Sequence, residues 1–246
     1  MATWVTHLRI SEGILEKYNI SNVSDFLIGA VAPDSGKLND DNYTYTPPSD
    51  VSHFSREGKG KWQAVDYQFY KRYIIPNIKN EKYSSFLLGY LSHLLTDVLW
   101  GHFIYYPTMA KYSAELKDKL FIWEIKKDWF EKDFDFLKNK TNWNIWNIFS
   151  QARYAYDILD YYPSNTINEK INIIKEYYSD EFNEKAPGKY LSKSDNEKFI
   201  DKAIEILVYA LPNIEYLYEN VDDTIFENLE KEFSELNRDH VWIGDL

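Results

Sequence analysis

The chain has 246 residues, and 39 acidic side chains against 28 lysines and arginines give it a formal net charge of −11. This charge opposes tight binding to nucleic acid phosphates or to anionic membrane surfaces. The chain has no cysteine, which excludes disulfides and thiolate metal sites, so any metal must be held by His, Asp and Glu. The length is typical of one sizeable domain, which we expect to cover residues 1–246.

The composition favours helices over a β architecture. Hydrophobic residues make up 44% of the chain, whereas the turn-forming Gly (9) and Pro (8) are sparse. No stretch alternates cleanly between polar and apolar residues, so we predict an all-α fold. The first ten residues lack the basic and then apolar pattern of a signal peptide, and we expect a cytoplasmic protein.

Apolar residues recurring near the helical period predict most of the elements. In chain order, helices are expected over residues 3–18, 25–31, 62–75, 81–106, one or two within 108–138, then 143–162, 168–178, 194–220 and 222–236. Ser24 is the expected N-cap of the second helix. The helix over 62–75 is expected to stop near Pro76, because residues before proline avoid the helical region. The longest helix, over 81–106, is expected to bend at Gly101 before Pro107.

Two stretches are predicted to lack regular structure. Residues 35–60 are rich in Asp, Asn, Thr, Pro, Ser and Gly, and they read as a long loop that carries a histidine. Long irregular loops are uncommon in compact domains and are often functional. The stretch 179–193 is the best candidate for a linker, since it includes a Pro-Gly pair.

The most apolar segment, residues 86–106, contains three titratable side chains, His93, Asp97 and His102. Burying such a group is costly unless it is paired or bound to a metal. His93 and Asp97 stand four residues apart, on one face of a helix, where an imidazole and a carboxylate can hold a single cation. The same three groups, and the lack of a second comparable segment, argue against a transmembrane span.

Four motifs occur in a particular order along the first 100 residues: Thr6-His7, the run from Phe26 to Asp34, Ser52-His53-Phe54, and the run from Phe86 to Asp97. This ordered set resembles the bacterial zinc-dependent phospholipase C family, whose all-helical fold is shared with fungal single-strand nucleases. The resemblance covers residues 1–140. It implies five zinc ligands, which are His7, Asp34, His53, His93 and Asp97.

The resemblance also implies individual roles. Asp97 would bridge towards the zinc beside the first helix, Asp34 would serve in addition as the catalytic general base, and His102 would bind the remaining zinc. On a straight helix, at about 100° per residue, His102 points away from His93. It therefore joins the other ligands only if the helix bends at Gly101, or else it serves a separate ion.

The sequence departs from the family pattern in two places. Trp4 is internal, whereas secreted members use a processed amino-terminal tryptophan as a zinc ligand. The family completes its last site with a His and a Glu one helical turn apart, but no histidine follows His102 until His240. Asp128 and Glu124 are the candidate substitutes, although they also fit a solvated helix face. We therefore expect one or two Zn²⁺ ions rather than a full three, and other divalent metals are possible.

These observations predict a metal-dependent hydrolase of phosphoric esters, similar to phospholipase C, which uses a metal-activated water and no protein nucleophile. The expected substrate is a small phosphate ester or a phospholipid headgroup, and no nucleic acid partner is expected. Two alternatives remain open: a non-catalytic metal-binding helical protein, and a nuclease-type phosphodiesterase of the same fold. The sequence does not indicate an oligomeric state.

Overall fold

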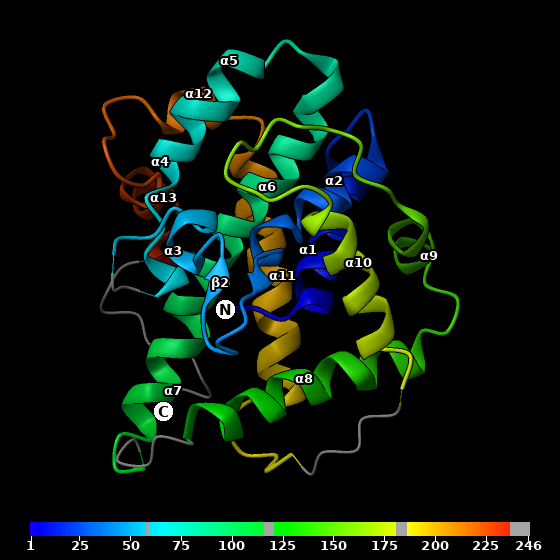
Figure 1. The fold of residues 1–246 in the computed structure, drawn as a ribbon. Helices are drawn as coiled ribbons and strands as arrows, with labels where there is room; N and C mark the ends of the chain where they lie inside the picture. Colours follow the sequence, from blue (N-terminus) through cyan, green and yellow to red (C-terminus); the bar gives the residue numbers. More distant parts are fainter. Residues whose placement is uncertain (58–59, 116–120, 181–185, 237–246) are drawn as a thin grey trace.

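The computed structural model describes residues 1–57, 60–115, 121–180 and 186–236, and almost all regular structure in these ranges is helical (Figure 1). The prediction of an all-α fold is confirmed. The first half contains α1 (Trp4–Lys17), α2 (Val23–Gly29), η1 (Ala32–Asp34), β1 (Lys37–Leu38), β2 (Tyr45–Thr46), α3 (Ser49–Ser52), η2 (Lys61–Gln63), α4 (Asp66–Phe69), η3 (Tyr70–Ile74), α5 (Ile75–Asn77) and α6 (Glu81–Trp100). The second half contains η4 (Gly101–Tyr105), α7 (Tyr106–Lys111), α8 (Phe121–Asn139), α9 (Asn144–Gln151), α10 (Thr166–Tyr177), α11 (Lys193–Ala210), α12 (Ile214–Leu217), α13 (Phe226–Glu232) and η5 (Ser234–Leu236).

Helix α6 is the central element, and α1, α2 and α11 pack against it (Figure 1). Its side chains are buried along nearly the whole length, including Leu91, Leu94 and Trp100. These side chains belong to one contiguous apolar core, which extends from Ala2 to Leu236. A polar side chain on the inward faces of α6 therefore has no access to water and needs a partner from a neighbouring element.

Two glycines allow α2 and α6 to cross at very short range. A Cβ atom on Gly89 would lie 2.1 Å from the carbonyl oxygen of Phe26, and one on Gly29 would lie 2.1 Å from that of Phe86. No residue with a side chain fits at either position without moving a backbone. The close crossing brings the carbonyl of Ala30, at the end of α2, within hydrogen-bond distance of His93 on α6.

The helix expected to stop near Pro76 ends at Asn77, whereas the helix expected to end before Pro107 continues through it in α7. Each proline continues a helix because a five-residue π-helical turn, η3 or η4, directly precedes its helical segment. In these turns the N–H of Ile75 donates to Tyr70 and that of Tyr106 donates to Gly101, each five residues back. The wider turn relieves the clash that proline causes in a regular α-helix.

The helix predicted over 143–162 is also shorter than expected, since α9 ends at Gln151. Residues 152–162 form no helix and are held by side chains instead: Tyr162 donates to the carbonyl of Ala32 at 2.6 Å, and Tyr161 donates to Tyr90 at 2.9 Å. Tertiary hydrogen bonds thus override the local helical pattern. The N-cap of α2 is Asn22 rather than Ser24, because its side chain accepts the N–H of Asp25.

The stretch 35–60 is less irregular than predicted. Its described residues contain the short antiparallel β1–β2 pair, with Lys37 opposite Thr46, and the single turn of α3. Parts of two other predicted stretches, 116–120 and 181–185, lie outside the described residues. Within the described ranges, no helix has both the length and the apolar character needed to cross a membrane.

Candidate metal centre

Four separate elements bring the predicted ligands together. Helix α1 supplies His7, the short η1 ends at Asp34, His53 directly follows α3, and α6 supplies both His93 and Asp97. The three histidines and Asp97 are at most 2% exposed. Residues that are far apart in the sequence therefore meet around one face of α6, below the solvent-exposed surface.

The rings of His53 and His93 face each other through their Nε2 atoms, which lie 3.3 Å apart. The Nδ1 atom of His93 lies 2.8 Å from the carbonyl oxygen of Ala30, and that of His53 lies 3.0 Å from the carbonyl oxygen of Ser49. A carbonyl oxygen can only accept, so each Nδ1 carries the hydrogen and each Nε2 presents a lone pair. Two lone pairs aimed at each other repel unless a cation lies between them.

One oxygen of Asp97 completes a triangle with these two nitrogens. Asp97 Oδ2 lies 3.7 Å from His53 Nε2 and 3.6 Å from His93 Nε2. Ligand atoms around a tetrahedral zinc with bonds of about 2.1 Å are separated by about 3.4 Å. Asp34 Oδ1 lies 3.3 Å from His53 Nε2, and Asp34, His53 and His93 form a second group whose ligand atoms could share an ion. The spacing of the donor atoms therefore fits a zinc ion.

The other oxygen of Asp97 faces α1. Asp97 Oδ1 lies 3.5 Å from His7 Nε2 and accepts the backbone N–H of Ala2 at 2.9 Å. Among the described residues, neither ring nitrogen of His7 has a hydrogen-bond partner, and neither has Asp97 Oδ2, although all three atoms are buried. Buried polar atoms without partners are rare in native proteins. A cation on this side of Asp97 would satisfy Nε2 of His7.

We call His7, Asp34, His53, His93 and Asp97 the His and Asp cluster. The charge states of this cluster suit metal binding. Burial, together with the neighbouring His7, holds the pKa of His93 well below its usual value, and burial also lowers the pKa of His53. For Asp97, burial alone would raise the pKa, but contact with His7 and His93 outweighs it and leaves the pKa below the usual range. Neutral imidazoles and ionised carboxylates are the forms that coordinate Zn²⁺.

Asp34 has two further partners that the sequence did not indicate. Trp4 Nε1 donates to its Oδ2 at 3.0 Å, and the Lys61 ammonium pairs with its Oδ1. Burial alone would raise the pKa of Asp34, but Lys61 and the hydrogen bond from His53 hold it well below the usual range. Lys61 directly follows the stretch 35–60 that was predicted to be a loop, and no motif marks it, because the contact arises only when η2 packs against α6.

A family model described as zinc-dependent phospholipase C matches residues 6–213 of the chain. The chain belongs to the zinc-dependent phospholipase C family. Searches of curated proteins and of solved structures found no match. The family match extends well beyond residues 1–140, where the resemblance was first apparent. It also agrees with the donor set, since a family that depends on zinc requires ligands such as these buried His and Asp side chains.

The remaining predicted ligands of the phospholipase C pattern are not brought to the cluster. His102 lies in the π-turn η4, where its Nε2 is 3.1 Å from the carbonyl oxygen of Glu235. Glu124 pairs with Lys127 at 2.8 Å. Among the described residues, the groups that can share an ion include neither of them, and His240 lies outside the described residues.

Asp128 is fully buried, yet its carboxylate is occupied by backbone donors. It accepts the N–H groups of Gly188, Lys189 and Tyr190 at 2.7, 2.9 and 2.7 Å. Three donors satisfy most of the lone pairs of a carboxylate. The position of Asp128 on α8 is thus explained by its attachment of residues 188–190 to this helix.

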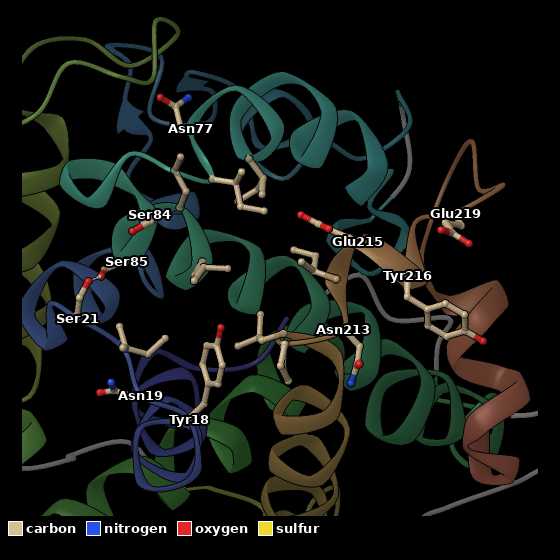
Figure 2. A pocket seen from close by; sticks show the side chains of 18 residues that line it. Tyr18, Asn19, Ser21, Asn77, Ser84, Ser85, Asn213, Glu215, Tyr216 and Glu219 are labelled. Carbon is tan, nitrogen blue, oxygen red and sulfur yellow. Dashed lines mark hydrogen bonds between the residues drawn. The ribbon is translucent and has the colours of Figure 1, made fainter.

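Two hollows in the surface lie away from the cluster. One, of about 630 Å³, is lined by the end of α1, the start of α6 and residues 211–219 (Figure 2). Its labelled polar side chains include Ser84, Asn213 and Glu215, and it contains no histidine. The other, of about 760 Å³, is lined by His102, Trp62 and Glu227 among others. Neither hollow contains a residue of the His and Asp cluster.

Proposed function

We propose that this chain hydrolyses phosphoric esters with zinc held by the His and Asp cluster, and that its substrate is a phospholipid headgroup ester or a small phosphate ester. The proposal rests on one observation above all, the triangle of His53 Nε2, His93 Nε2 and Asp97 Oδ2, with edges of 3.3 to 3.7 Å. The family match supports the same chemistry. No cysteine or other strong nucleophile is needed for it.

Each ligand has a defined part in this proposal. His53, His93 and Asp97 Oδ2 would hold one ion with Asp34 beside His53, and His7 with Asp97 Oδ1 would hold a second, since His93 has a single nitrogen left to offer. When bound, zinc polarises a phosphoryl oxygen and lowers the pKa of water towards neutrality. The carbonyls of Ala30 and Ser49 fix the tautomer and the orientation of the two rings.

Asp34 carries two proposed roles, as a ligand and as the general base, and Asp34→Asn separates them. The depressed pKa makes its carboxylate a weak proton acceptor, so we expect the ligand role to dominate. The variant should then lose zinc together with turnover. Full zinc content combined with lost turnover would instead support the role as base.

The proposal is tested by measuring zinc content and turnover on the purified protein. Substrates are bis(p-nitrophenyl) phosphate and p-nitrophenyl phosphorylcholine, each with and without a chelator. We expect zinc-dependent hydrolysis of at least one ester, and loss of both metal and activity in His93→Ala and Asp97→Ala. Full metal occupancy in these two variants would show that the ligand assignment is wrong.

A second candidate function, a closed and non-catalytic zinc site, is favoured by the burial of the cluster. His53, His93 and Asp97 are 0% exposed, and Lys61 covers the Asp34 side. Structural zinc sites are closed, whereas catalytic ones keep a coordination position for water. Stoichiometric zinc without turnover of any ester would identify this function. Cleavage of single-stranded oligonucleotides in the same assay would identify the nuclease alternative.

A further inference from the structure

Lysines from three separate elements approach the Asp34 side of the metal centre. Lys61, from η2, pairs directly with the Asp34 carboxylate. Lys170, from α10, places its ammonium 5.4 Å from the centre of the Trp4 ring, whose Nε1 donates to the same carboxylate. Lys126, from α8, is close enough for the charges of both Lys61 and Asp34 to act on it. We call these three side chains the lysine cluster.

Two members of the lysine cluster have no carboxylate partner among the described residues. Lys126 and Lys170 are partly buried, and burial lowers the pKa of both. Lys202, which is also partly buried, is instead paired with Glu205 and Glu235. A chain with 39 acidic residues has no shortage of carboxylates, so the unpaired charges mark a place where an external anion can bind.

Aromatic rings hold the two unpaired lysines in place. The Lys126 ammonium lies 4.6 Å from the centre of the Trp123 ring. Trp4, beneath Lys170, is itself fixed by edge-on contacts with Phe130 and Tyr177. These contacts stabilise the cations without neutralising them, because a ring face attracts positive charge but carries no net charge. The charges of Lys126 and Lys170 are therefore available to a ligand.

We propose that the lysine cluster is an anion subsite beside the metal centre, which selects phosphoric esters whose headgroup leaves them with net negative charge. This inference rests on the proposed function and specifies its substrate class. A zwitterionic choline ester places a quaternary ammonium near the phosphate, and such a cation is stabilised by acidic or open aromatic surroundings rather than by lysines. An anionic phospholipid meets the lysines with charge of the opposite sign.

The test compares the zinc-loaded wild type with the double variant Lys126→Ala/Lys170→Ala on vesicles of phosphatidylglycerol and of phosphatidylcholine. We expect the wild type to prefer the anionic lipid by about tenfold in kcat/KM, and the double variant to lose most of that preference. An equal preference in both proteins would overturn the proposal, and so would a wild type that favours phosphatidylcholine.

A second readout does not require turnover. Calorimetry with inorganic phosphate measures anion binding directly, and we expect the dissociation constant to rise about tenfold in the double variant at unchanged zinc content. If the wild type hydrolyses no ester but this rise is seen, the proposed function fails while the anion subsite stands. An unchanged dissociation constant would overturn the anion subsite itself.

Two controls separate charge from packing. Lys126→Arg/Lys170→Arg keeps both charges and should retain the lipid preference and the phosphate affinity. Lys82→Ala removes an exposed lysine that lies 5.0 Å over a different ring, Tyr83, on α6, and should change neither quantity. An effect of Lys82→Ala as large as that of the double variant would also contradict the proposal.

Discussion

The Nε2 atoms of His53 and His93 lie 3.3 Å apart, and each ring is fixed from behind by a backbone carbonyl. The arrangement is unfavourable for two neutral rings alone and favourable around a cation. Ring orientation is set by α2 and α3 rather than by the ligands themselves. We therefore expect metal binding to be coupled to the packing of these elements.

Removal of the metal should destabilise the protein. Asp34 and Asp97 then remain buried with no ion to neutralise them, and only the first has a lysine partner. We expect complete chelation to lower the melting temperature by about 10 °C, measured by calorimetry on dialysed protein. The loss should reverse on adding zinc. An unchanged melting curve after verified metal removal would count against a shared buried cluster.

Lys61→Met should affect the metal-free protein more than the zinc-loaded one. Lys61 and the metal both neutralise Asp34, so the loss of the lysine leaves an unpaired buried carboxylate only when zinc is absent. We expect the free energy of unfolding, measured with urea, to fall by about 2–3 kcal/mol in the metal-free protein and by much less in the zinc-loaded one. Lys61→Arg is the control that keeps the charge. Equal losses in the two forms would show that Lys61 does not share this role.

Gly89→Ala should damage the metal centre from a distance. The new methyl group would force α2 away from α6, and with it the Ala30 carbonyl that orients His93. We expect a loss of about 2 kcal/mol or more in unfolding free energy, together with weaker zinc binding in a competition titration. Ser84→Ala, on the same helix, should change neither. Wild-type zinc affinity in Gly89→Ala would mean that the ring is held by other contacts.

Asp128→Ala should reduce stability without reducing zinc content. The substitution removes the acceptor for three backbone N–H groups of residues 188–190. We expect a loss of about 3 kcal/mol in denaturant unfolding, with a smaller loss in Asp128→Asn, which keeps one acceptor oxygen. Elemental analysis should find the wild-type amount of zinc. A fall in zinc would restore Asp128 to the ligands that the family pattern suggested.

Asp133 on α8 should make the stability of the protein depend on pH in a way that is independent of the metal. Burial raises its pKa to about 7, although Thr3 and Tyr178 donate hydrogen bonds to it. Because the pKa of the folded state lies above that of the unfolded state, this stabilisation is complete near pH 4 and is lost as the pH rises through about 7. As the pH rises from 5 to 8, the free energy of unfolding of Asp133→Asn should increase by about 2–3 kcal/mol relative to that of the wild type.

Urea unfolding of zinc-loaded protein at both pH values measures this difference. Taking the difference between the variant and the wild type cancels the titration of the histidines, which both proteins share. Asp135→Asn, at an exposed position on the same helix, should show no pH-dependent difference. If the difference in unfolding free energy between Asp133→Asn and the wild type is the same at both pH values, Asp133 is ionised throughout this range.

The sequence by itself determined the helical class and the identity of the five clustered side chains. Helical periodicity is a local property, and it places His93 and Asp97 on one face of α6 whatever surrounds that helix. Ordered sequence motifs can be recognised without a structure, and their resemblance to the phospholipase C family indicated His7, Asp34 and His53. Zinc was implied by the resemblance to the phospholipase C family, whereas the absence of cysteine indicated only that His, Asp and Glu must hold any metal.

Only the tertiary structure decided which polar residues gather at the candidate metal centre and which accept hydrogen bonds from the backbone elsewhere. Asp128 and Asp97 are both aspartates on helices with buried faces, and they differ only in what other elements bring to them: backbone N–H groups in one case and imidazoles in the other. Lys61 meets Asp34 through the packing of η2. Such contacts depend on burial and on the crossing of distant segments, and neither leaves a periodic signal in the chain.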